Sequence, residues 1–144
     1  MALNPLRWKQ RLENLTKANT YLVAACSQGE YSILERDGLV QTFRFSFELT
    51  WKTLKDLVEY EGYETASPRN AIRTALEANH ISAEDCETLL DALSKRNLLT
   101  HTYDEANALE AQNLIIKKLS PTIAKIVQAL NKKATDEAID KGSD

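Results

Sequence analysis

The sequence predicts an all-α protein, an antiparallel up-and-down bundle of four main helices plus a short one. Apolar residues recur at three- and four-residue steps, and no short segment shows strand-like alternation flanked by turns. Only four glycines and three prolines interrupt the 144 residues, which favours long regular elements. We expect one domain over residues 1–131, followed by a polar tail, residues 132–144, that frays.

The first helix is expected over residues 5–26, where apolar side chains recur at spacings of three, four or seven. Proline at its start is tolerated because the first amide hydrogens of a helix have no intrahelical partner. Residues 28–30 then indicate a turn, and residues 32–36 a short helical lead-in. Asp37-Gly38 indicates a further break or a helix entry.

The second helix is expected over residues 39–60, with Gly62 as its C-terminal cap. Its main apolar stripe consists of Val40, Phe43, Phe47, Trp51, Leu54 and Val58. Phe45, Leu49 and Leu57 widen this stripe, so we expect the helix to be buried on more than one side. An aromatic stripe of this kind is more typical of a core than of a surface that stacks on bases.

A short third helix is expected to begin at Ser67-Pro68, an N-cap followed by proline at the first helical position. It should end near residue 80, where His80 serves as a capping residue. Ser82 with Asp85 three residues later has the spacing of a capping box and predicts the start of the next helix. That helix is rich in leucine and runs into residues 94–104.

The last helix is expected to begin at Asp104, whose carboxylate can cap it. An apolar residue recurs at every seventh position, namely at Leu109, Ile116, Ile123 and Leu130. Because this phase is kept across Pro121, we favour one long helix that is kinked there. The alternative is two helices, the second capped by Ser120.

Composition narrows the class of protein but not its function. A content of 43% hydrophobic and 27% charged residues is ordinary for a soluble globular protein, and the net charge of −3 neither indicates nor excludes nucleic-acid binding. Cys26 and Cys86 are expected to be buried, reduced thiols, which suggests a cytoplasmic protein. No spacing of ligands predicts a metal, no motif predicts a cofactor, and neither a membrane span nor a signal peptide is expected.

Residues 94–104 concentrate the reactive side chains of the chain. Arg96, Asn97, His101 and Tyr103 place a guanidinium, an amide, an imidazole and a phenol within eight residues. On a regular helix Asn97 and His101 would share a face, whereas Arg96 and His101 would point about 140° apart. Either the helix loosens near Thr100, or two copies of the motif face each other across a two-fold axis.

This set of residues resembles the R-x4-H-x-Y signature of HEPN domains, and in particular the nucleotidyltransferase substrate-binding subunits, or HepT-type toxins. The apolar helix over residues 43–57 and the outline of residues 5–130 resemble that family too. The resemblance implies a HEPN bundle and a homodimer with both motifs at the shared interface. It also implies a small nucleotidyltransferase partner, encoded nearby, that acts as an antitoxin by adenylylating Tyr103.

The side chains suit a metal-independent endoribonuclease acting on RNA. His101 can give or take a proton near neutral pH, and the guanidinium of Arg96 matches phosphate oxygens. Asn97 could orient His101 from the same helix face. With one motif histidine per chain, acid and base would be the two symmetry mates. AMP on Tyr103 would add bulk and negative charge beside the groove and so disfavour RNA.

Other cations offer weaker signals of RNA binding. Arg69, Arg73 and Lys95 are candidate contacts, and so is a set consisting of Arg44, Lys52 and Lys55. Charged residues at these spacings are more typical of a solvated face. Two alternatives to the ribonuclease remain: a non-catalytic subunit that binds a substrate or nucleotide for the nucleotidyltransferase, and a helical dimerisation module in which the motif is vestigial.

Overall fold

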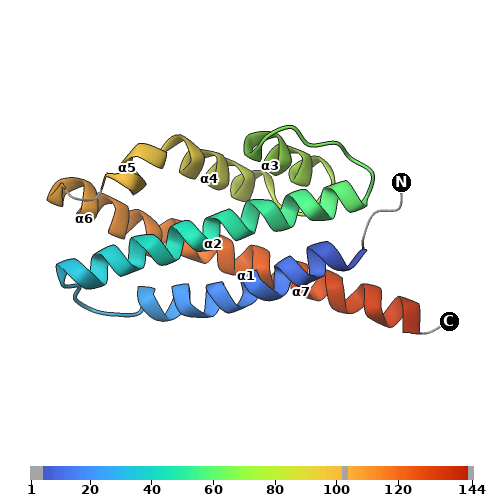
Figure 1. Cartoon of the computed structure of the whole chain (residues 1–144), viewed down its shortest axis with the longest axis horizontal. Coiled ribbons are helices and arrows are strands. Elements are labelled where there is room, and N and C mark those ends of the chain that lie inside the picture. The colour runs from blue at the N-terminus through green and yellow to red at the C-terminus, as the bar shows by residue number, and fades with distance from the viewer. Residues whose placement is uncertain (1–4, 102–103, 143–144) are drawn as a thin grey trace.

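The computed structural model describes residues 5–101 and 104–142, and most of them are helical (Figure 1). The elements are α1 (Pro5–Cys26), α2 (Ile33–Tyr60), α3 (Pro68–Glu77), α4 (Ala83–Ser94), α5 (Arg96–Thr100), α6 (Glu105–Leu114), the π-helical turn η1 (Ile115–Leu119) and α7 (Ser120–Gly142). No strand occurs among the described residues. The prediction of an all-α bundle is therefore confirmed.

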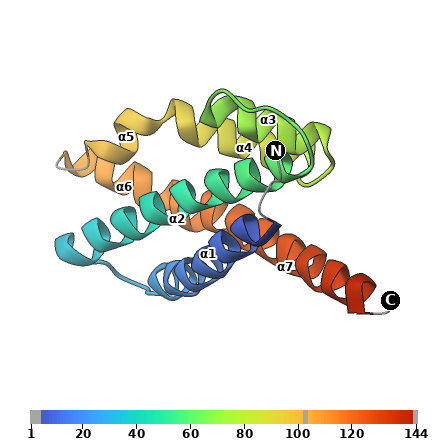
Figure 2. The ribbon, with the colours of Figure 1, turned by 45° about the vertical axis from the view of Figure 1, so that its right-hand side comes forward.

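Three long rods lie side by side: α1, α2, and the rod formed by α6, η1 and α7 (Figures 1 and 2). The shorter helices α3 to α5 form the fourth side, with α3 packed on α2 and α4 packed on η1. The core between them is apolar. Its largest fully buried side chains include Trp8, Leu15, Leu22, Phe43, Leu54, Leu57, Ile72, Leu89, Ile115, Leu119 and Ile123. Among the described residues, no helix combines the length and apolarity needed to cross a bilayer.

The expected break at Gly38 is wrong, because α2 runs without interruption from Ile33. Its true start is a capping box: the Ser32 hydroxyl accepts from the Glu35 amide at 3.1 Å, and Glu35 Oε1 accepts from the Ser32 amide at 2.9 Å. A glycine inside a helix costs only about 1 kcal/mol relative to alanine. Burial of Leu39 and Val40 directly after Gly38 offsets that cost.

The end of α2 was predicted correctly at Gly62. This glycine has φ of +100°, its amide donates to the Glu59 carbonyl, and the Tyr63 amide donates to the Val58 carbonyl. The two bonds form a Schellman motif, which needs a left-handed residue at this position. The predicted start at Ser67 is confirmed as well, since its hydroxyl accepts from the Asn70 amide.

The rod from α6 to α7 is continuous, as favoured from the sequence, but it contains a π-helical turn immediately before Pro121. At this turn the Ser120 amide donates to the carbonyl of Ile115, five residues back. A π turn inserts one extra residue and so shifts the apolar face of the segment before it relative to that of the segment after it. This explains why Ala108 and Ala111 are buried in α6 while Leu109, expected in the core, is 41% exposed.

Helix α7 continues to Gly142, past Asn131, after which the chain was expected to fray. Ala134 packs against the core, and the Lys9 ammonium lies 3.1 Å from a carboxylate oxygen of Glu137. These contacts tie the last turns of α7 to the start of α1. The division into residues 1–131 and a fraying tail, 132–144, stays a prediction.

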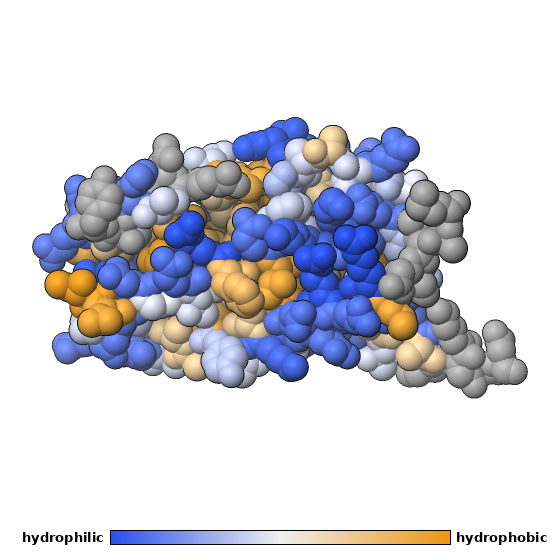
Figure 3. All heavy atoms as spheres, in the orientation of Figure 1, coloured by the Kyte–Doolittle hydropathy of each residue, from blue (hydrophilic) through white to orange (hydrophobic). Residues whose placement is uncertain are grey.

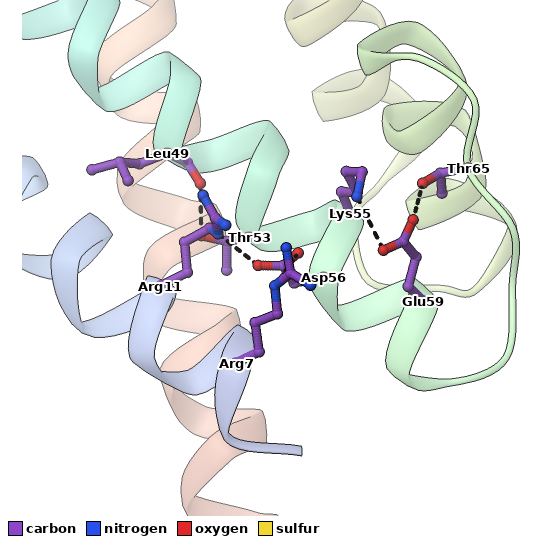
Figure 4. A network of polar contacts seen from close by, with 8 residues as sticks. All are labelled: Arg7, Arg11, Leu49, Thr53, Lys55, Asp56, Glu59 and Thr65. Carbon is purple, nitrogen blue, oxygen red and sulfur yellow. Dashed lines mark hydrogen bonds and ion pairs between the residues drawn. The ribbon is translucent and has the colours of Figure 1, made fainter. Parts of the chain in front are cut away.

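A cluster of paired charges joins the start of α1 to the last third of α2 (Figure 4). The carboxylate of Asp56 is buried and lies 2.6 Å from Arg11 Nε and 3.6 Å from Arg7 Nε. One turn along α2, Glu59 accepts from Lys55 at 3.0 Å and from Thr65 at 2.6 Å. Because a buried carboxylate needs a cation, this cluster fixes how α1 lies against α2.

Candidate functional site

The helix carrying the motif breaks where the motif begins. Helix α4 ends at Ser94, Lys95 has a non-helical turn conformation, and the five-residue helix α5 starts at Arg96 and stops at Thr100. His101 therefore lies outside any helix. Because α5 ends at Thr100, His101 is not part of the regular helix for which the 140° divergence from Arg96 was calculated.

Only part of the motif lies within the described residues. The backbone of Arg96 and Asn97 belongs to α5, while their side chains, together with residues 102–103 and hence Tyr103, lie outside what the structure describes. His101 is exposed, and its carbonyl accepts from Asn107 Nδ2 at 3.3 Å. Asp104 caps α6 as predicted, because its carboxylate accepts from the amides of Ala106 and Asn107.

The break places His101 at one end of the bundle. Figures 1 and 2 show the junction of α5 and α6 at the end where α1 finishes and α2 begins, far from the start of α1 and the end of α7. Leu99 is 5% exposed and anchors α5 to the core, while Thr100 is exposed. One short helix thus holds the backbone of Arg96 and presents His101 at the surface.

The three weaker RNA-binding candidates, Arg69, Arg73 and Lys95, have different surroundings in the structure. Arg69 donates to the Ser94 hydroxyl at 3.4 Å, which places its guanidinium beside the start of the motif. Lys95 pairs with Asp91 one turn back, at 3.0 Å. Arg73 is exposed on α3. Its positive charge acts to lower the pKa of the Cys86 thiol on α4, against the larger effect of burial. The structure therefore brings Arg69 to the motif, with Lys95 next to it in the chain.

Two hollows in the surface along α2 were not predicted from the sequence. The larger, about 670 Å³, lies between α2 and the α4–α5 segment and reaches Thr100, the residue before His101. The smaller, about 520 Å³, lies between α1 and α2 and is lined by Tyr21. Gln41, Phe45 and Leu49 line both, so the hollows adjoin across α2. Figure 3 shows apolar side chains gathered at the middle of this face.

Phe45 is an exception to the expectation that Phe45, Leu49 and Leu57 bury the second helix on more than one side. It is 62% exposed, whereas Phe43, two residues earlier, is 1% exposed. Leu49 is half-buried and Leu57 is fully buried. The periodicity of α2 identified the buried stripe, but which flanking residues are covered depends on how the other helices pack around α2.

The cysteines are unsuited to nucleophilic chemistry. Burial raises the pKa of the Cys86 thiol. Burial also raises the pKa of the Cys26 thiol, and it outweighs the opposite effect of a hydrogen bond with Ser120. Both thiols are therefore protonated at neutral pH, and the thiolate is the nucleophile. Within residues 5–101 and 104–142, no three His, Cys, Asp or Glu side chains gather as ligands for a metal.

Comparison with known proteins agrees with the fold. A family model described as nucleotidyltransferase substrate binding protein like matches residues 10–132. A crystal structure of a protein from Thermus thermophilus is similar, with 31% sequence identity and a TM-score of 0.70. The similarity covers 83% of this chain and 97% of the Thermus chain. No curated protein matches the sequence.

Proposed function

This chain belongs to the nucleotidyltransferase substrate binding protein-like family, and on that premise we propose that it is a metal-independent endoribonuclease controlled by a nucleotidyltransferase. Membership implies association with a nucleotidyltransferase. The finer statements, that the chain cuts RNA, forms a homodimer and acts as a toxin, are our proposal. They rest on the motif of Arg96, Asn97, His101 and Tyr103.

One observation carries the proposal: His101 is exposed directly after a five-residue helix that begins at Arg96. Five helical residues span only about 7.5 Å along the helix axis. An arginine side chain and an imidazole anchored that far apart can both reach a single phosphodiester. A longer helix, running regularly through residue 101, would have pointed them to different sides.

The chemistry needs no metal. One imidazole takes the proton from a ribose 2′-hydroxyl, whose oxygen attacks the phosphorus, and a second imidazole protonates the departing 5′-oxygen. Arg96 stabilises the charge on the phosphate oxygens, and Asn97 holds an imidazole in orientation. Since the chain carries one motif histidine, we propose that the two imidazoles come from two copies in a homodimer.

Control by the partner would act through Tyr103. Transfer of AMP from ATP to its phenol oxygen forms a phosphodiester and releases pyrophosphate. The added nucleotide brings negative charge next to His101, which repels an RNA backbone. The partner nucleotidyltransferase would thus act as antitoxin.

The test is cleavage of an RNA panel by pure protein in EDTA. We expect cleavage by the wild type and none by His101→Ala at equal folded concentration. Incubation with the partner and ATP should add the mass of one AMP to the wild type, not to Tyr103→Phe, and should stop cleavage. Equal inertness of wild type and His101→Ala on all RNAs would rule out the enzyme.

The second candidate function is a non-catalytic subunit that presents a substrate to the nucleotidyltransferase. The hollow of about 670 Å³ next to Thr100 favours it, since its size suits a nucleotide-sized ligand. This function predicts a stable complex with the partner, ligand binding that survives His101→Ala, and growth indifferent to expression of this chain alone. A toxicity assay of wild type against His101→Ala, with and without the partner, separates the two functions.

A further inference from the structure

We propose that the two hollows form one path for single-stranded RNA, which we call the α2 path, leading from Tyr21 on α1 across α2 to Thr100 beside the motif. The inference rests on the proposed ribonuclease function, for which it identifies the surface that holds the substrate. Gln41, Phe45 and Leu49 line both hollows, so the two adjoin along this stripe of α2, and a strand passes from one to the other over these side chains.

The hollows of the α2 path are long enough for several nucleotides. Together they flank α2 from Gln41 to Lys52, a rise of about 17 Å along the helix axis. Bases stacked about 3.4 Å apart along this axis would place roughly five nucleotides beside α2. The path ends at Thr100, so a strand lying in it arrives at His101 without turning around the bundle.

Two exposed aromatic rings lie in the α2 path. Tyr21 is 72% exposed and Phe45 is 62% exposed, and both line the smaller hollow. Phe45 also lines the larger one. Exposed aromatic rings in a groove offer stacking surfaces to any base, which is how proteins hold single strands without reading their sequence.

The charge of the α2 path is opposite to that of the whole chain. Among the described residues, four cationic side chains line the two hollows against one carboxylate, that of Glu48, a local balance of +3 in a chain of net charge −3. The four cations are Arg11, Lys17, Arg44 and Lys52. Arg11 pairs with Asp56 and Lys52 with Glu48. Within the part of the chain that the structure describes, Lys17 and Arg44 form no ion pair and are available to phosphates.

Polyanionic RNA fits this combination better than a protein partner does. A groove that pairs apolar rings with unpaired cations matches a polymer that carries one base and one phosphate in every unit. A protein partner would need only the apolar residues, whereas here Glu48, one helical turn from both Arg44 and Lys52, supplies one negative charge for two cations. Over residues 5–101 and 104–142, the only carboxylate lining either hollow is that of Glu48, which faces Lys52 at 3.7 Å.

The experiment measures binding separately from cleavage. A fluorescent oligouridylate of about twelve nucleotides is titrated with the His101→Ala protein in EDTA, and the Kd is followed by anisotropy at several salt concentrations. In this background, Phe45→Ala should raise the Kd about tenfold through loss of one stacked base. Arg44→Gln should raise it several-fold and reduce the salt slope by about 0.7, the value for one phosphate contact on a single strand.

Matched controls lie outside both hollows. Tyr63→Ala removes another exposed aromatic ring, and Lys118→Gln removes another exposed cation. Both should leave the Kd within twofold. Since Phe45 and Arg44 are exposed, their variants should melt at the temperature of the parent, which circular dichroism checks.

The outcomes separate the α2 path from the ribonuclease. Unchanged Kd values in Phe45→Ala and Arg44→Gln would overturn the path even if the wild type cleaves RNA. Weakened binding in both, with no cleavage by the wild type, would support the path and refute the enzyme. A third outcome is that Phe45→Ala dissociates an oligomer in sedimentation and leaves the salt slope unchanged. The surface would then be an interface between copies of the protein, and the RNA path would be overturned.

Discussion

The two ends of α2 differ in how they treat charge, and the difference separates stability from function. At its C-terminal end the buried Asp56 is paired with Arg7 and Arg11, and Glu59 is bonded to Lys55 and Thr65. The N-terminal half of α2 carries exposed Phe45 and also Arg44, which has no counter-ion among the described residues, and the interrupted helix leading to His101 lies near that end of α2. A region in which each charge has a partner contributes to folding, whereas an exposed cation without a counter-ion is available to a ligand.

The largest expected effect is on activity at the motif end. His101→Ala should lower RNA cleavage by about a hundredfold to ten-thousandfold, the range for loss of a general acid or base. The free energy of unfolding should stay within about 0.5 kcal/mol of the wild type, because the side chain is exposed. Gel-based cleavage and urea denaturation measure the two quantities. A large loss of stability would place His101 among the structural residues.

The opposite result is expected at the paired end. Asp56→Ala should lower the free energy of unfolding by about 2–3 kcal/mol, since it removes the charge-assisted hydrogen bond from Arg11 and the ion pair with Arg7 at a buried site. Cleavage per folded molecule should not change. The matched control is Asp91→Ala, which breaks an exposed pair with Lys95 near the motif and should cost at most about 0.5 kcal/mol. Equal losses for both variants would contradict the contrast between the two ends.

Replacement of glycine by alanine should change stability in opposite directions at two positions, Gly38 inside α2 and Gly62 just after it. Gly62→Ala forces an L side chain into φ of +100° and should destabilise the protein by about 1–2 kcal/mol. Gly38→Ala lies inside the helix, where nothing approaches an added Cβ within 4 Å, and should stabilise by about 0.5–1 kcal/mol. Thermal melts of both variants measure the difference. Destabilisation by Gly38→Ala would indicate that the helix is interrupted there after all.

The smallest expected effect depends on pH. Burial raises the pKa of Glu59, but hydrogen bonds from Thr65 and Lys55 outweigh it, so this pKa lies below its ordinary value. A lowered folded-state pKa gives stability that is present above the unfolded-state pKa and is lost as pH falls through the folded-state value. Thr65→Val should therefore be slightly less stable than wild type at pH near 7 and approach it near pH 3. Denaturation at both pH values checks this, and a deficit that does not change with pH would exclude Glu59 as its cause.

Local chemistry was sufficient to predict where most helices begin and end. Gly62, Ser67 and Asp104 cap their helices as expected, because a cap depends on a few adjacent residues. The prediction from local chemistry was wrong at Gly38, because a glycine interrupts a helix only when the residues beside it are not held in the core. Here Leu39 and Val40 are buried in the core and keep the helix intact.

The candidate site, like the fold, could be predicted only in part from the sequence. The sequence drew attention to residues 94–104 because four reactive side chain types occur there together, and the roles of Arg96, Asn97, His101 and Tyr103 stay predictions. The α2 path could not be found from the sequence. Arg44 and Lys52 were expected to lie on a solvated face, and Phe45 was expected in the core, because periodicity cannot tell which flank of a helix its neighbours cover.

The helical class, the buried stripe and most of the caps can be inferred from the sequence alone, since each depends on residues within a few positions of one another. The remaining features depend on how distant segments pack. The π-helical turn before Pro121 moves Leu109 out of the core, and the packing of the other helices on α2 leaves Phe45 uncovered. Both outcomes depend on which surfaces distant segments occupy, and no short stretch of sequence contains that information.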